Sequence, residues 1–145
     1  KLDLHSTFKE FDGATLGAVL LAPTRIYVRS IVALLNSYKR KKIVHGMAHI
    51  TGGGLVGNIT RVLPSDCDAV LQMSAWPKPP IFDFLRRLGP VRKSEMYRVF
   101  NMGIGFVLIV ARDFADAIQD KLTHSGEAVY RIGQISPGTG KVVLK

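Results

Sequence analysis

The stretch "AHITGGGLVGN", residues 48–58, carries four glycines within six residues, and the fold assignment depends on it. Before it, "KIVHGMAHI" is short, apolar and partly β-branched, which predicts a strand that ends at Thr51. After it, "LVGNITRVL" predicts a short helix that is ended by Pro64. Glycine loses more conformational freedom on folding than any other residue, so this cluster indicates a special turn or the close approach of another group.

A strand, a glycine loop and a helix in succession can form an anion site, because free N–H groups and the helix dipole favour negative charge at a helix start. We therefore predict that a phosphate or another ligand approaches Gly52, Gly53 and Gly54. The alternative interpretation is that these glycines only form a tight corner between the strand and the helix.

Two known phosphate-binding patterns can be compared with this loop. Gly52, Gly54 and Gly57 match G-x-G-x-x-G, but the acidic residue that a dinucleotide site needs about 20 positions later is absent. The P-loop pattern is excluded, because Asn58 and Ile59 stand where a Lys and a Ser or Thr are required.

Three further residues are candidates for a site. On a strand, His45 and His49 would share one face, and His49 would lie beside the glycine loop as a hydrogen-bond donor or proton carrier. Asn101 lies in a second glycine-containing loop, "NMGIG", which a sheet could bring near the first loop. Arg25 follows a proline-fixed turn, where its guanidinium could meet a phosphate or a carboxylate.

The rest of the chain alternates between helical and strand patterns. Helices are predicted over residues 15–21, 24–42, 79–89, 94–100 and 112–126, and strands over residues 68–73, 103–111, 127–135 and 142–144. Ser94 is the expected N-cap of its helix. This order predicts an α/β (α+β) fold, with a mixed β-sheet of four to five strands covered by helices. We expect one domain over residues 1–145, with residues 1–14 irregular.

The composition restricts the class of function. The net charge of +9 and the run "KRKK" at residues 39–42 suit phosphorylated ligands as well as nucleic acid. Most aromatic residues lie in apolar patterns rather than among the positive charges, which disfavours a nucleic-acid-binding module. Cys67 is the single cysteine, so we expect no disulfide framework, no cysteine zinc site or other metal site, and a reducing, cytoplasmic location. No apolar run approaches the length of about 20 residues that spans a bilayer, so we expect no membrane partner.

Several motifs together resemble one known family. These are "TLGAVLLAPTRIYV", "AHITGGGLVGNITRVLP", "WPKPPIFDFLRRLG", "SEMYRVFNMGIGFVLIVA" and "YRIGQI", which occur here in this order. The chain from about Thr15 onward is similar to the C-terminal half of the phosphoribosylformylglycinamidine cyclo-ligases, also called aminoimidazole ribonucleotide synthetases.

The resemblance implies an activity and partners. Enzymes of this family use ATP to activate the formyl amide oxygen of phosphoribosylformylglycinamidine, and an amidine nitrogen then closes the imidazole ring with loss of phosphate. ATP and Mg²⁺ would lie mainly on an N-terminal domain, which also forms the homodimer and whose Asp-rich segment has no counterpart here. The present domain alone would then be inactive.

The resemblance also implies roles for particular residues. Thr51 and the three following glycines match the family's phosphate-binding loop, and His49 matches its adjoining histidine. Asn58 matches the polar residue at the start of the next helix. Asn101, Met102 and Gly103 match a second segment that faces the cleft. Gly57 departs from the family, which often carries a charged or bulkier residue there.

Two other functions stay open at this point. One is another ATP-using member of the same superfamily, such as a formylglycinamidine synthetase or a selenophosphate synthetase. The other is a basic nucleic-acid-binding module.

Overall fold

The computed structural model describes residues 2–145. In chain order the elements are η1 (Lys9–Phe11), α1 (Leu16–Leu20), α2 (Val28–Ser37), β1 (Val44–His49), α3 (Gly54–Thr60), β2 (Cys67–Leu71), α4 (Pro80–Leu88), α5 (Lys93–Val99), β3 (Phe106–Val110), η2 (Arg112–Phe114), α6 (Ala115–His124), β4 (Gly133–Pro137) and β5 (Val142–Leu144). None of these helices is long and apolar enough to cross a membrane.

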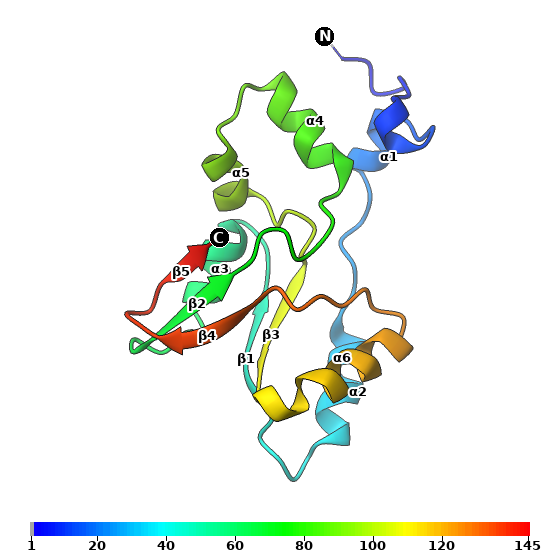
Figure 1. Ribbon diagram of the computed structural model, residues 1–145. Coiled ribbons are helices and arrows are strands. Elements are labelled where there is room, and N and C mark those ends of the chain that lie inside the picture. Colours follow the sequence, from blue (N-terminus) through cyan, green and yellow to red (C-terminus); the bar gives the residue numbers. More distant parts are fainter. Residues whose placement is uncertain (1) are drawn as a thin grey trace.

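The strands confirm the predicted α/β class, but they form two small sheets instead of one (Figure 1). β1 and β3 make an antiparallel pair in which His49 lies opposite Phe106. β2 is the middle strand of the second sheet, where it pairs antiparallel with β4 and parallel with β5. The mixture of parallel and antiparallel pairing that the sequence predicted therefore occurs in the second sheet.

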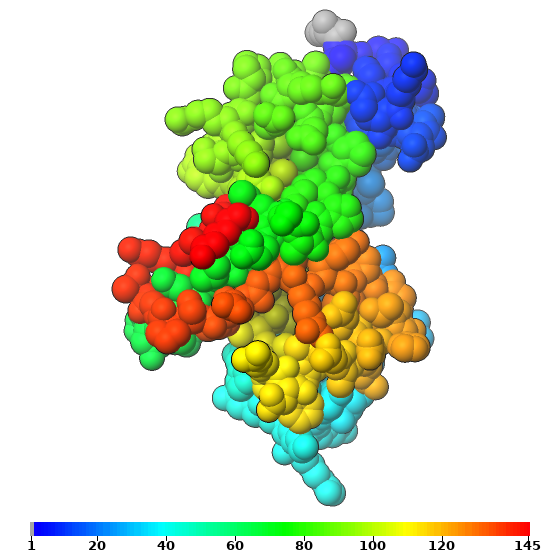
Figure 2. Space-filling view, viewed as in Figure 1, coloured from blue at the N-terminus to red at the C-terminus, as the bar shows by residue number. Residues whose placement is uncertain are grey.

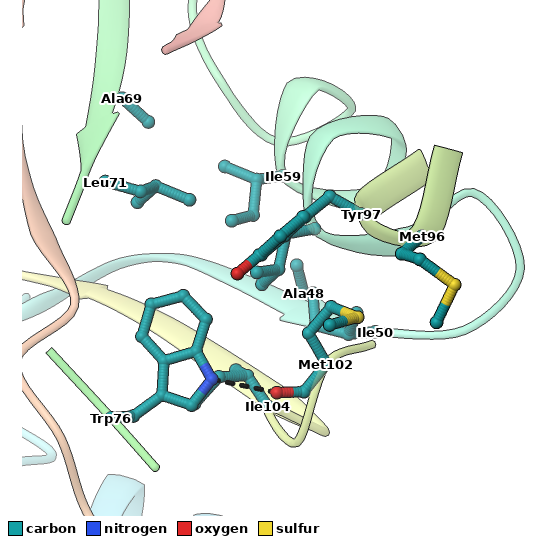
Figure 3. Close-up of a cluster of buried hydrophobic side chains, with 11 residues drawn as sticks. Ala48, Ile50, Ile59, Ala69, Leu71, Trp76, Met96, Tyr97, Met102 and Ile104 are labelled. Carbon is teal, nitrogen blue, oxygen red and sulfur yellow. Dashed lines mark hydrogen bonds between the residues drawn. The ribbon is translucent and has the colours of Figure 1, made fainter. Parts of the chain in front are cut away.

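The largest core cluster joins the two sheets to α3 and α5. Figure 3 shows its side chains from both sheets and both helices around Trp76, whose indole Nε1 donates a hydrogen bond of 2.9 Å to the carbonyl oxygen of Met102. Leu55 and Ile59 of α3 are fully buried in this cluster. Because α3 carries both of them, burial of its inner face fixes where the glycine loop before it lies.

Two smaller clusters complete the packing. Leu34 of α2 packs with Ile118 and Leu122 of α6. Phe11 and Phe84 pack edge to face with ring centroids 5.0 Å apart, which attaches the N-terminal segment to α4. Residues 2–14 contain the short η1 turn, and an isolated bridge joins Thr7 to Thr15.

The strand predicted over residues 127–135 begins only at Gly133, and that prediction was wrong for residues 127–132. Residues 127–132 are held against α6, because the Arg131 guanidinium pairs with Asp116 and donates to Gln119. Ser94 is also not the N-cap that the sequence predicted: Arg92 occupies that position, and its side chain makes no capping bond.

Candidate functional site

The glycine loop is held in shape from inside by Asn58. This side chain is only 5% exposed, and its Nδ2 donates to the carbonyl oxygens of Gly54 at 2.8 Å, Thr51 at 3.2 Å and Gly52 at 3.3 Å. Buried polar groups require such partners, so the amide and the loop carbonyls satisfy one another. The side chain of Asn58 therefore positions the loop from behind.

Gly53 and Gly54 have structural reasons to be glycine. Both have positive φ angles, 99° and 60°, which favour glycine. A methyl group on Gly54 would overlap the carbonyl oxygen of Tyr97 and would lie 2.9 Å from that of Phe100. The group that approaches Gly54 is thus the backbone of α5, and the part of the loop open to a ligand narrows to Thr51, Gly52 and Gly53.

The loop also has backbone N–H groups that could donate hydrogen bonds to a ligand. The N–H of Gly54 donates to the Thr51 carbonyl at 3.1 Å, and that of Gly57 to the Gly53 carbonyl at 3.0 Å. Within residues 2–145, the N–H groups of Gly52 and Gly53 make no backbone hydrogen bond. A Cβ built on Gly52 would meet nothing within 4 Å, so the space beside this residue is open.

His49 lies exposed at the end of β1, directly before this loop. Its ring packs edge to face with Tyr27, at 5.8 Å between centroids, and is stacked with Phe106 at 6.1 Å. Tyr27 in turn lies against Gly105, where any side chain would collide with its hydroxyl group. Burial raises the pKa of Tyr27, so its hydroxyl stays protonated at neutral pH.

The second predicted segment lies beside the first loop. The N–H of Ile50 donates to the Gly105 carbonyl at 2.9 Å, and the Phe100 carbonyl lies against Gly54. Asn101 Oδ1 accepts a 3.0 Å hydrogen bond from the N–H of Gly103 and so closes a tight turn. Pairing of β1 with β3 thus brings together the two segments that the sequence singled out.

Arg25 is engaged away from the loop. Its Nε lies 2.7 Å from a carboxylate oxygen of Glu127, and its guanidinium donates to the Gly126 carbonyl at 2.7 Å. The Ser30 hydroxyl donates to the same carboxylate at 2.5 Å. Arg25 therefore connects the start of α2 to the end of α6.

A cavity of about 1100 Å³ lies beside this ion pair, and Arg25, Ser30 and Glu127 are among the residues that line it. It is lined by β3, by residues 127–135 and by Lys78 and Gly103, but not by the glycine loop. Figure 2 shows the molecule hollowed beneath the orange segment that leads into β4.

Lys78 is a residue that the sequence interpretation missed. Its ammonium lies 3.9 Å from the centre of the Trp76 ring and donates to the Trp76 carbonyl at 2.9 Å. Burial, assisted by Lys93, lowers the pKa of Lys78. The sequence pattern that could have indicated Lys78 is "WPKPP", in which prolines stand on both sides of the lysine. These prolines restrict the backbone and so hold Lys78 close to Trp76.

Among residues 2–145, no three His, Cys, Asp or Glu side chains gather in a group that could hold a metal ion. Mg²⁺ prefers oxygen ligands such as carboxylates. The side chains that this structure describes do not fit a metal centre.

Residues 1–145 match the family described as "AIR synthase related protein, C-terminal domain". The chain belongs to this family. The matched range includes the glycine loop and the "NMGIG" segment, which the fold places side by side.

Curated relatives of this AIR synthase related domain are named phosphoribosylformylglycinamidine cyclo-ligase. The one from Limosilactobacillus fermentum is 40% identical over 100% of this chain and 42% of its own length. That from Bacillus subtilis is 44% identical over 97% of this chain and 39% of its own. That from Neisseria meningitidis is 48% identical over 90% of this chain and 37% of its own. The chain thus spans about two fifths of the length of these relatives.

Solved structures show the same fold in more distant proteins. Thiamine-monophosphate kinase from Stenotrophomonas maltophilia matches 99% of the AIR synthase related domain and 42% of the kinase chain, with a TM-score of 0.64 at 19% identity. The hydrogenase maturation protein HypE from Escherichia coli matches 90% of the domain and 41% of its own chain, with a TM-score of 0.61 at 21% identity. At these identities the likeness concerns the fold alone.

Proposed function

We propose that this chain is the C-terminal domain of an ATP-dependent phosphoribosylformylglycinamidine cyclo-ligase in purine biosynthesis. The observation that carries the proposal is 40–48% identity to relatives of that name, over 90% or more of this chain. The enzyme would close the imidazole ring of phosphoribosylformylglycinamidine to give aminoimidazole ribonucleotide. This domain alone, without an ATP-binding half, would be inactive.

In this proposal, Thr51, Gly52 and Gly53 hold a phosphate of the substrate or of ATP through main-chain N–H groups. The two N–H groups without backbone partners and the open space beside Gly52 support this role. Fixed donors of this kind stabilise phosphoryl oxygens without having to reorganise during the reaction. Asn58, buried behind the loop, keeps these donors in position.

His49 is the proposed proton carrier. It is exposed, it directly precedes the loop, and the rings of Tyr27 and Phe106 fix its orientation. A histidine can donate or accept a proton near neutral pH, which the ring-closing step requires of a nearby group. Asn101 and Gly103 would contribute to the same site from the second segment.

The partners of this domain are part of the proposal. They are an N-terminal ATP-binding domain, which would also hold Mg²⁺, a phosphorylated purine precursor, and a second subunit of a cytoplasmic homodimer. The relatives are about two and a half times as long as this chain, which supports a further domain in them.

The alternatives have less support. A formylglycinamidine synthetase or selenophosphate synthetase would share the fold, but the relatives at 40–48% identity carry the cyclo-ligase name. For nucleic-acid binding, exposed aromatic side chains would have to lie among the basic residues. Near the run at residues 39–42, Tyr38 and Phe114 are half-buried and pack against each other, with centroids 5.9 Å apart, and the Lys41 ammonium lies over the Phe114 ring at 5.1 Å. Neither ring is therefore fully exposed for stacking with a base.

The test is a full-length chimaera in which this chain replaces the matching segment of the Bacillus subtilis relative. ATP-dependent formation of aminoimidazole ribonucleotide by the purified chimaera is the expected result. A folded, dimeric chimaera without this activity, beside an active parent enzyme, would refute the assignment.

A further inference from the structure

Strand β3 has one paired edge and one open edge. In the part of the chain that the structure describes, it pairs only with β1. The N–H of Ile50 donates to the Gly105 carbonyl, so Gly105 turns its carbonyl toward β1. Alternate residues of an antiparallel strand point their N–H and C=O groups to opposite sides. Phe106, Leu108 and Val110 therefore point theirs away from β1, and between residues 2 and 145 these groups have no other backbone partner.

The open edge of β3 faces the cavity of about 1100 Å³. Every residue from 103 to 110 lines this cavity, whereas a cavity over one face of a strand would meet mainly alternate residues. An unpaired strand edge is a template for another extended chain, and folded proteins normally cover it. The cavity thus lies where a further strand could pair.

The opposite wall of the cavity is also extended backbone. Residues 128–135 line it without a break, and those before Gly133 belong to no helix or strand. Ile118 and Leu122 of α6 add apolar side chains to this wall. The cavity is therefore a groove, with a strand edge on one side and a helix and an extended segment on the other. We call it the β3 groove.

The β3 groove carries a positive charge at each end. Pro77 and Pro79, the neighbours of Lys78, lie against Gly103, which places Lys78 before the start of β3. Arg112 lines the groove just after the end of β3. Neither Lys78 nor Arg112 forms a salt bridge with any residue in the range 2–145. The other basic side chains that line the groove already have carboxylate partners.

We propose that the β3 groove binds an extended, acidic peptide of another protein, which adds a strand to the open edge of β3. Main-chain hydrogen bonds to β3 would supply affinity, and apolar side chains of the peptide would fill the middle of the groove. Acidic residues at its two ends would pair with Lys78 and Arg112. From Gly105 to Arg112 an extended chain covers about 23 Å, which is the length of about seven residues. The proposal does not depend on the ring-closing reaction.

Peptide binding tests this assignment. The probe is a fluorescein-labelled heptapeptide with glutamate at both ends and alternating valine and threonine between them. Its anisotropy is measured with the 145-residue chain and with the full-length chimaera. One control peptide has lysine at both ends. A second control keeps the glutamates but is N-methylated at the valines and threonines, so that its main chain cannot donate hydrogen bonds.

The acidic peptide should bind to both proteins, and each control peptide should bind at least about tenfold more weakly. Lys78→Met and Arg112→Met should each weaken binding of the acidic peptide at least about threefold, because each removes one ion pair. Lys121→Met is the matched control, since Lys121 is exposed on α6 and does not line the groove. It should change the affinity less than about twofold.

Amide exchange followed by nuclear magnetic resonance locates the bound peptide. The N–H groups of Phe106 and Leu108 point away from β1, so they should exchange at least about tenfold more slowly with the acidic peptide present. The N–H of Val107 points toward β1 and should change little.

Four results would each overturn the proposal. The first is failure of the acidic peptide to bind. The second is equal binding of the N-methylated peptide, which would indicate a site for an apolar anion. The third is slow exchange at Phe106 and Leu108 without peptide, since the walls would then pair with each other or with a second copy. The fourth is binding that is lost in a folded chimaera, because the rest of the longer chain would then cover the groove. None of these readouts uses ring closure, so this proposal and the proposed function can fail separately.

Discussion

The side-chain amide of Asn58 donates a 2.8 Å hydrogen bond to the carbonyl oxygen of Gly54, one turn earlier in α3. The same nitrogen reaches the carbonyls of Thr51 and Gly52, so one buried side chain defines the conformation of the loop. The loop that the sequence suggested as a ligand site is thus also a structural element with its own buried support.

Replacing Asn58 with Ala should destabilise the domain by about 1–3 kcal/mol, because the loop carbonyls lose a buried donor. Urea unfolding followed by circular dichroism measures the change. Thr60→Ala is the matched control, since Thr60 makes the same kind of bond to the carbonyl four residues earlier, but at the surface. Equal effects of the two substitutions would contradict the structural role of Asn58.

Gly54→Ala should cost more stability than Gly52→Ala. A methyl group at Gly54 overlaps the Tyr97 carbonyl and requires a positive φ, which together cost about 2–4 kcal/mol. At Gly52 a methyl group meets no atom within 4 Å, so a change within about 0.5 kcal/mol is expected. Thermal unfolding of both variants measures the difference. A Gly54→Ala variant as stable as the parent would show that α5 can move away from the loop and make room for the methyl group.

Gly53→Asp should abolish ring closure in the full-length chimaera, because it places a carboxylate where an anion is proposed to bind. Any side chain at this position also strains a backbone whose φ is 99°. Gly53→Asn isolates the charge, since Asn has the same shape and tolerates a positive φ equally well. We expect Gly53→Asp to lose at least about 100-fold more activity than Gly53→Asn. Similar turnover of the two variants would contradict the proposal that a phosphate binds to this loop.

Acid should weaken the end of the second sheet through Asp68. The backbone N–H groups of Lys141 and Thr139 bond its carboxylate at 2.8 Å and 2.7 Å, and they hold the pKa of Asp68 below its usual value. A lowered pKa in the folded state means that this carboxylate stabilises the fold above the unfolded-state pKa, about 3.9, and that the contribution is lost as the pH falls through the folded-state pKa. Asp68→Asn should therefore lose less stability than the parent chain between about pH 5 and pH 2, as measured by urea unfolding. Parallel pH profiles for the two proteins would contradict this.

Local patterns predicted most of the elements correctly. The strand before the glycine loop, the helix after it, and the edge strand at residues 142–144 occur where the periodicity and the turn residues placed them. These signals depend on neighbours within one or two turns of the chain, which the sequence displays directly.

The failed predictions depend on partners far away in the sequence. Residues 127–132 have a strand pattern, but Arg131 binds α6 and Glu127 binds Arg25, so the sheet begins later. The division into two sheets depends likewise on which distant strands pair. Gly54 was interpreted as open to a ligand because nothing near it in sequence indicates that the carbonyls of residues 97 and 100 pack against it.

Tyr27 connects the start of α2 to the ends of β1 and β3. Its ring contacts His49 and Phe106, and its hydroxyl lies against Gly105. Tyr27 is also the residue that directly precedes α2. A shift of this helix would therefore move the tyrosine ring and change its contact with His49. The tyrosine thus links the start of α2 with both of the segments that border the candidate site.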